Sequence, residues 1–274
     1  NDEIMAKETG RSTNVDAFTG NKTITVEDGG RSDTIRAGEG DMVDIKLEGS
    51  ARVETITVYE TELKVETGTN FIQSIKGFSV NTDIKVGTGG VGTIRFNSGE
   101  QENAHKVVAD GFVSLIDFDD SNANPDNDQA SNITLNSFAG QVRLGERRDV
   151  VTTGDEQAWV ENIATNGGND TVNLGASGAA SVNLGTGKDK ISVKKLEDNN
   201  DDFDFGNVLI QGGSGADTIL FNTFRSKVTF SLENSAGAQD ISGNGRAFLV
   251  NNIENITGTN RNDDLTGSAM ANVI

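Results

Sequence analysis

Aspartates that follow closely spaced glycines are the residues of this chain best suited to chemistry. In GGSGADTIL (Gly212–Leu220), Asp217 comes two residues after Gly215 and two before the aliphatic Ile219. Glycine permits a tight turn because it has no Cβ, and the carbonyl oxygens of such a turn can face inward beside the carboxylate. Calcium prefers oxygen ligands of this kind. The stretch therefore predicts a calcium-binding turn in which Gly213 and Gly215 allow close backbone approach.

The same spacing recurs along the chain. Further copies supply Gly187 with Asp189, Gly168 with Asp170, and Asp263 near the C-terminus; weaker copies within residues 29–45 supply Asp33 and Asp41. One copy cannot bury its aliphatic side chain alone, whereas stacked copies can. We therefore expect calcium at these aspartates, and the alternative for each of them is an ordinary Asx turn without metal.

Two other segments keep the glycines and lose the carboxylate. Gly175–Asn183 has Ala180 at the aspartate position, and GTGGVGTIRF (Gly87–Phe96) has Gly92 there, followed by Ile94 at the aliphatic position. We expect these coils to pack into the fold without an ion.

These repeats resemble the RTX repeat, also called the hemolysin-type calcium-binding repeat. The resemblance is clearest for Gly212–Leu220 and Gly258–Ile274, and it covers well under half of the chain. It implies a right-handed parallel β-roll in which two nonapeptides make one coil and calcium lies between successive turns on each side. Within that family the chain resembles an extracellular surface-layer or adhesin-like member.

Short strands must hold these turns in place. Apolar residues alternate at period two in VETITVYETELKVE (Val53–Glu66), and Gly, Asn and Asp separate such segments. We expect an all-β fold, a parallel β-roll or β-solenoid with Gly/Asp-rich calcium-binding turns, and a sandwich is the competing architecture. Residues 1–160 should form a more degenerate β-solenoid or β-rich domain, and residues 161–274 an RTX-like β-roll with an acidic insert at 194–207. Residues 103–130 are the least repeat-like part: its first section, ENAHKVVADGFVSLIDF, suits a short helix or a strand pair, and its second section, DDSNANPDND, suits a loop.

Composition limits the partners. Lys and Arg number 23 and Asp and Glu 42, which gives a formal charge of −19, and there is no cysteine. Such a chain repels nucleic acid and anionic membrane surfaces, and bound divalent cations would relieve its own repulsion. Disulfides and thiolate metal sites are excluded. No apolar run is long enough to span a bilayer. We expect calcium ions as ligands, with self-assembly or a cell-surface polysaccharide as further partners, and neither nucleic acid binding nor membrane insertion.

Catalytic motifs are missing from the sequence. His105, the one histidine, has no nucleophile signature around it and is expected to be exposed or to cap an element. There is no H-E-x-x-H and no G-x-S-x-G motif. The main hypothesis is a non-enzymatic, calcium-binding structural or adhesive protein, secreted or at the bacterial cell surface, that folds or assembles on binding calcium. Two alternatives stay open: an accessory RTX module of a secreted enzyme or toxin, and a catalytic β-helix acting on acidic polysaccharide.

Overall fold

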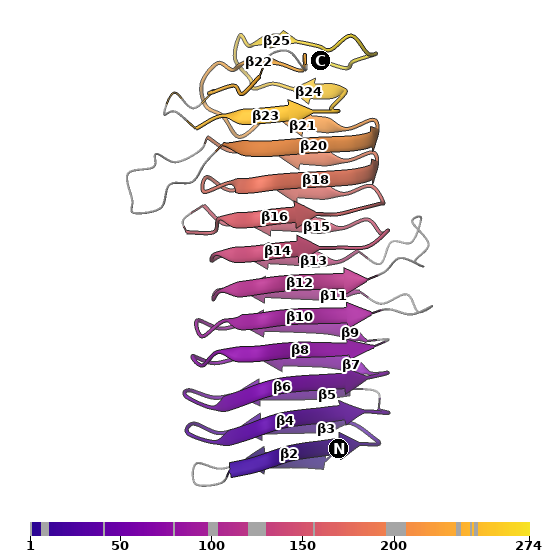
Figure 1. The fold of residues 1–274 in the computed structure, drawn as a ribbon, viewed down its shortest axis with the longest axis vertical. Helices are drawn as coiled ribbons and strands as arrows, with labels where there is room; N and C mark the ends of the chain where they lie inside the picture. The colour runs from indigo at the N-terminus through magenta and orange to yellow at the C-terminus, as the bar shows by residue number, and fades with distance from the viewer. Residues whose placement is uncertain are drawn as a thin grey trace.

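The chain forms a β-solenoid, seen in a computed structural model (Figure 1). The structure describes residues 2–6, 11–40, 42–78, 80–97, 104–119, 130–155, 157–195, 207–233, 237–241, 243 and 246–274. Within these ranges the chain consists of strands and turns, and none of it is a helix that could cross a membrane. The predicted all-β, parallel solenoid is confirmed, and the competing sandwich is not what the chain forms.

Two long parallel sheets make up the sides of the solenoid. Sheet A has 12 strands, in spatial order β1 (Asp2–Ala6), β3 (Lys22–Val26), β5 (Met42–Leu47), β7 (Glu62–Glu66), β9 (Asn81–Val86), β11 (His105–Ala109), β13 (Asn132–Leu135), β15 (Val150–Thr153), β17 (Thr171–Asn173), β19 (Lys190–Ser192), β21 (Thr218–Leu220) and β24 (Asn255–Thr257). Sheet B has 11 strands, in spatial order β2 (Arg11–Phe18), β4 (Arg31–Gly38), β6 (Arg52–Tyr59), β8 (Ile72–Phe78), β10 (Val91–Asn97), β12 (Val113–Asp119), β14 (Ala139–Arg143), β16 (Val160–Ala164), β18 (Ala179–Gly187), β20 (Val208–Gly215) and β23 (Phe248–Asn251). A small sheet C pairs β22 (Thr229–Ser231) with β25 (Asp264–Thr266). Up to β21, consecutive strands alternate between sheets A and B, so each coil gives one strand to each sheet.

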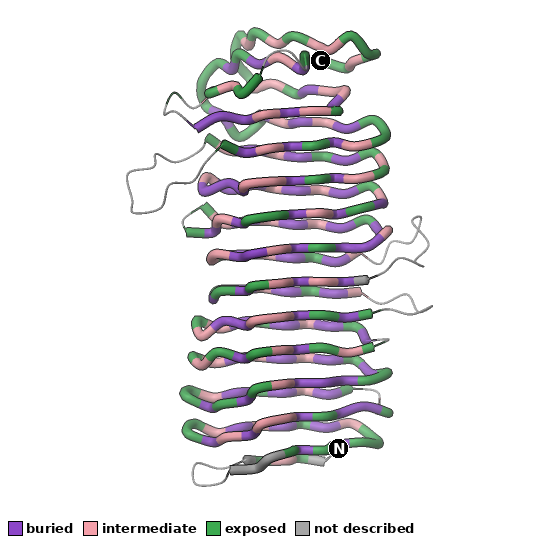
Figure 2. The backbone as a smooth tube through the Cα atoms, viewed as in Figure 1, coloured by how far each residue is buried: buried purple, intermediate pink, exposed green. Residues whose placement is uncertain are grey.

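The parallel register places equivalent residues of successive coils directly above one another. Buried positions consequently recur at the same places along the coils (Figure 2). Two of the resulting ladders are Ile35–Ile56–Ile75–Ile94 in sheet B and Val172–Ile191–Ile219–Ile256 in sheet A. Side chains alternate across a strand, so one set from each sheet faces the interior and packs as stacked aliphatic layers. The predicted aliphatic positions Ile94 and Ile219 are confirmed as buried.

The solenoid runs without a break through the predicted boundary at residue 160. Strands β14, β16 and β18 pair in sequence, and β18 still pairs with β20 across the acidic insert. Residues 196–206 of that insert lie outside the described residues. Of the least repeat-like part, residues 105–119 form two strands, β11 in sheet A and β12 in sheet B, rather than a helix or two strands paired with each other. The predicted loop that follows, residues 119–128, lies outside the described residues from residue 120 on.

The turns lie along two opposite edges of the solenoid. At one edge the chain passes from sheet B to sheet A, and the front arrows of Figure 1 point toward it. At the other edge the chain returns from sheet A to sheet B. We call these the B-to-A edge and the A-to-B edge.

Candidate metal centre

Three of the predicted aspartates stack in one column on the B-to-A edge. Asp170, Asp189 and Asp217 each directly precede a strand of sheet A, and the pairing of β17, β19 and β21 places them above one another. Oδ1 of Asp189 accepts the backbone N–H of Asp170 at 2.7 Å. Oδ1 of Asp217 accepts the N–H of Asp189 at 2.9 Å. Each carboxylate is thereby held to the coil below it.

Two acidic residues that the sequence did not single out extend the column. Oδ1 of Asp170 accepts the N–H of Asp149 at 2.7 Å, and Oε2 of Glu254 accepts the N–H of Asp217 at 2.9 Å. We call Asp149, Asp170, Asp189, Asp217 and Glu254 the carboxylate column.

The glycine turns bring backbone oxygens close to this column. Gly168, Gly187, Gly213 and Gly215 all have positive φ, at 113°, 148°, 106° and 142°. A Cβ on Gly187 would lie 1.6 Å from the carbonyl oxygen of Gly168, and a Cβ on Gly215 equally close to that of Gly187. Only glycine fits such stacking. The predicted close backbone approach is present at all four positions.

One carboxylate oxygen of each of the three stacked aspartates is buried without a hydrogen-bond partner. Asp170, Asp189 and Asp217 are buried, and across the described part of the chain their Oδ2 atoms have no hydrogen-bond partner. Burial raises the pKa of Asp170 to about 8 and that of Asp189 to about 6, and neighbouring carboxylates add to both effects. The pKa of Asp217 is raised for the same reasons. A buried carboxylate with one unmet oxygen is a group that a bound cation would stabilise in its charged form.

The donor set decides which cation fits. The described ranges contain no cluster of three or more His, Asp or Glu side chains that could hold a metal ion. A cation here would therefore combine carboxylate Oδ2 atoms with backbone carbonyl oxygens of the glycine turns. All of these are hard oxygen ligands, which suit calcium, whereas zinc prefers histidine and thiolate.

Asp263 lies apart from the column and has its own partners. It precedes β25 of sheet C, where Oδ1 accepts the N–H of Val228 at 2.9 Å and Oδ2 accepts that of Thr259 at 2.6 Å. Desolvation acts to raise the pKa of Asp263, but these hydrogen bonds hold it below its ordinary value. The bond from Thr259, four residues before the carboxylate, keeps it within its own turn.

The two N-terminal candidates are not brought to the column. Asp33 lies within β4, 3.6 Å from Nε of Arg31, in the sheet B row that also contains Gly92 and Ala180. In that row Asp33 is followed by Glu54 and then by the uncharged Gln73 and Gly92, and it is not joined to the buried aspartates of the B-to-A edge. Asp41 lies outside the described residues. Of the two edges on which the RTX resemblance implies calcium, the stacked aspartates thus occupy one.

Below Asp149 the column changes from acidic to neutral. His105 stands two coils lower, directly above Thr82, and its Nδ1 lies 3.2 Å from Thr82 Oγ1. Its ring stacks on Phe96 and packs at a tilt against Phe118, with ring centroids 5.5 and 4.4 Å away. The prediction of an exposed or capping histidine is wrong, because the ring is part of the core.

Arg147 takes the place of a turn glycine at the lower end of the column. LGERRDVV (Leu144–Val151) matches LGTGKDKI (Leu184–Ile191) in its leucine, first glycine, aspartate and aliphatic positions, with Arg147 where the second has Gly187. Arg147 is fully buried. After desolvation, its charge is the second cause that lowers the pKa of His105, to about 3. The match is the signal by which Asp149 could have been found.

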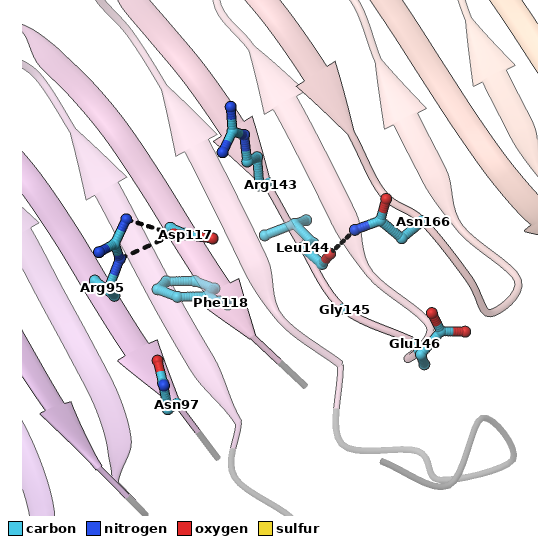
Figure 3. A pocket seen from close by; sticks show the side chains of 9 residues that line it. All are labelled: Arg95, Asn97, Asp117, Phe118, Arg143, Leu144, Gly145, Glu146 and Asn166. Carbon is cyan, nitrogen blue, oxygen red and sulfur yellow. Dashed lines mark hydrogen bonds and ion pairs between the residues drawn. The ribbon is translucent and has the colours of Figure 1, made fainter. Parts of the chain in front are cut away.

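A cleft of about 320 Å³ opens beside this lower end (Figure 3). Arg95 and Asp117 face each other in it, with guanidinium nitrogens 2.8 and 2.9 Å from Asp117 Oδ2. The amide of Asn166 donates to the carbonyl oxygen of Leu144. These polar groups already satisfy one another, so we assign no ligand to the cleft.

Comparison of the chain with protein-family models, curated proteins and solved structures gives no match. The resemblance to RTX repeats therefore rests on the residues themselves and stays a prediction.

Proposed function

We propose that this protein binds calcium along the carboxylate column and uses the bound ions to stabilise an extracellular, structural or adhesive solenoid. The observation that carries the proposal is the set of three buried Oδ2 atoms, on Asp170, Asp189 and Asp217, that lack a hydrogen-bond partner beside stacked glycine turns. A buried carboxylate left in this state costs free energy, and a divalent cation offsets that cost.

Each part of the turn has a separate role in this proposal. Oδ1 of each aspartate holds the N–H of the coil below, and this fixes the carboxylate in place. Oδ2 and the carbonyl oxygens of the glycine turns would hold the ion. Calcium supplies positive charge that lets the buried aspartates ionise together. Binding therefore couples to folding, since the unfolded chain has no such stacked ligands.

The acidic composition supports an extracellular setting. A chain with a formal charge of −19 and no disulfide needs another source of stability, and calcium is plentiful outside cells. Affinities of about 10⁻⁴ to 10⁻³ M, typical of extracellular modules, would then suffice. We include a secreted or cell-surface location and a non-enzymatic role in the proposal, because the repeats resemble surface-layer and adhesin segments and the sequence lacks nucleophile and zinc-protease motifs.

Calorimetric titration with calcium, together with thermal unfolding in calcium and in EDTA, tests the proposal. Asp189→Asn keeps an Oδ1 acceptor for Asp170 and removes the charge. At free calcium 100 times its Kd, loss of one site should remove about 2.7 kcal/mol of stabilisation. In EDTA the variant should be at least as stable as the wild type, because a buried charge is gone.

Asp263→Asn is the matched control, since both oxygens of Asp263 already have partners. It should leave the calcium dependence of unfolding unchanged. Absence of binding heat, together with equal stability in calcium and EDTA, would contradict the proposal. Electron microscopy of calcium-loaded protein tests the structural part separately, by looking for filaments or lattices.

A further inference from the structure

The A-to-B edge carries a second column, which has no part in the calcium proposal. Arg31 and Arg52 are directly paired at the starts of β4 and β6. The register through β8, β10, β12, β14 and β16 continues this column with the residue just before each strand, which is Gly90 before β10 and an aromatic residue before each of the other four. We call the resulting set the edge strip: Arg31, Arg52, Phe71, Phe112, Phe138 and Trp159. It follows the starting ends of the sheet B arrows in Figure 1.

The upper part of the edge strip is a stack of aromatic rings. Phe112 and Phe138 stack with ring centroids 5.6 Å apart and 15° between planes, and Phe138 and Trp159 with 5.5 Å and 25°. Phe71, two coils below Phe112, is 53% exposed and Phe112 is 38% exposed. Because the rings lie face to face along the solenoid axis, it is their edges that meet the solvent. Ring edges carry the positive part of the aromatic quadrupole and attract oxygen atoms.

The lower part of the edge strip carries two arginines and is hollowed. A cleft of about 290 Å³ is lined by both arginines, by Glu54 and by Phe71, at the junction of the two parts. Arg31 lies 3.6 Å from both Asp33 and Glu54, whereas no ion pair is found for Arg52 in the described part of the chain. Like charges directly opposite in a sheet destabilise it. Asp33 and Glu54 offset part of this repulsion at Arg31, and an anion beside Arg52 would offset the rest.

We propose that the edge strip binds a linear anionic polysaccharide, with an acidic group of the glycan at Arg31 and Arg52 and the sugar chain along the ring edges. The arginines and the ring edges present positive potential to an oxygen-rich anion along one straight line. Successive coils repeat every ~4.8 Å, comparable to the length of one sugar unit, so a linear chain can lie along the strip with about one sugar at each coil, and Gly90 leaves one of these coils without a ring. This inference deepens the adhesive part of the proposed function by naming its partner class.

Two other partners fit less well. The formal charge of −19 opposes every polyanion, and it opposes a nucleic acid most, because binding there depends on neutralising one phosphate per nucleotide, whereas hyaluronan carries one carboxylate per two sugars. A second copy that paired strip to strip in parallel would place the arginines near their own counterparts, and an antiparallel pairing would place them on aromatic rings, which carry no counter-charge. Both partners are outcomes that the experiment distinguishes.

Binding can be followed through Trp159, which is the one tryptophan of the chain and belongs to the edge strip. Hyaluronan, a linear carboxylated glycan, is titrated at saturating calcium, with a neutral linear glucan of matched length in parallel. We expect a saturable change in tryptophan fluorescence with hyaluronan and none with the glucan. Arg52→Ala should weaken binding about tenfold or more and reduce its salt dependence, as loss of a charge-assisted contact does. Phe112→Ala should also weaken it.

Arg36→Ala is the matched control, because Arg36 is an exposed arginine of β4 outside the edge strip. It should leave hyaluronan affinity unchanged. Equal losses in Arg36→Ala and Arg52→Ala would mean diffuse charge binding and would overturn the proposal. The proposal would also be overturned if the neutral glucan bound as well as hyaluronan, or if neither glycan bound. The same holds if single-stranded DNA bound more tightly than hyaluronan, or if sedimentation showed that the strip only mediates dimerisation. Calorimetry with calcium alone, run on the same variants, shows separately whether the calcium proposal holds.

Discussion

Asp189 accepts the backbone N–H of Asp170 through Oδ1 at 2.7 Å, while Oδ2 of the same buried carboxylate has no partner in the described part of the chain. One oxygen of the carboxylate therefore maintains the stacking of the coils and the other is left for a ligand. Because these carboxylates are buried, the stability of the fold should depend on pH.

Without calcium, the solenoid should lose stability as pH rises from 6.5 to 8.5. The pKa of Asp170 is about 8 in the folded protein, above its ordinary value of 3.8, so its protonated form stabilises the fold and this contribution is lost as pH rises through about 8. Asp189, with a folded pKa of about 6, loses most of its contribution at lower pH. Urea unfolding in EDTA across this window measures the effect.

His105 is the reason for starting the window at pH 6.5. Burial lowers its pKa to about 3, so its contribution to stability is lost as pH falls below its ordinary value of 6.5, opposite in sign to the aspartates. Above pH 6.5 this histidine is neutral in both states. Saturating calcium should reduce or reverse the loss of stability between pH 6.5 and 8.5, because the bound ion favours the ionised carboxylates. Stability in EDTA that is constant or rises from pH 6.5 to 8.5 would show that Asp170 ionises normally.

The column was predictable where local sequence determines it. Asp170, Asp189 and Asp217 each have a glycine two residues before and an aliphatic residue two after, and the structure stacks all three. Asp263 has the same neighbours in part, yet Thr259 and Val228 occupy its oxygens. Which carboxylate stays unsatisfied depends on the coil below, and the local pattern does not contain that information.

The local sequence pattern did not predict which residues of distant coils share one row. Asp149 was missed because Arg147 interrupts the glycine pattern, and Glu254 because it reaches the same row with a longer side chain and no glycine turn. The rows of the solenoid join residues whose separation varies, 19 between Asp170 and Asp189 and 28 between Asp189 and Asp217. A fixed nine-residue period therefore predicts the fold but not the membership of a row such as the edge strip.

The stacking of the turns predicts a large difference between two glycine substitutions. Gly187→Ala should destabilise the protein by about 3 kcal/mol or more, because the new Cβ would lie 1.6 Å from the carbonyl oxygen of Gly168 and neither backbone can move alone. Gly20→Ala is the control: Gly20 also has a positive φ, of 75°, but nothing lies within 4 Å of its Cβ position. Its cost should be only the backbone strain, about 1 kcal/mol. Thermal and urea unfolding of both variants in EDTA measure these costs; equal losses would mean that the turns are not closely stacked.

The buried pair Thr82 and His105 should behave as a coupled unit. His105→Phe keeps the ring between Phe96 and Phe118 but leaves the Thr82 hydroxyl without its partner, and Thr82→Val does the same to Nδ1 of the histidine. Each single change should cost about 1–3 kcal/mol, the penalty for a buried polar group left unsatisfied.

Combining the two changes removes both polar partners at once, and the double variant should be close to the wild type in stability. The double-mutant cycle is measured by urea unfolding at pH 7.5, where the histidine is neutral. His105→Phe should also abolish the part of the acid destabilisation that arises between pH 6.5 and 3, since the group whose pKa is about 3 is gone. Additive single and double effects, or an unchanged acid profile, would mean that His105 is not held as a buried neutral partner of Thr82.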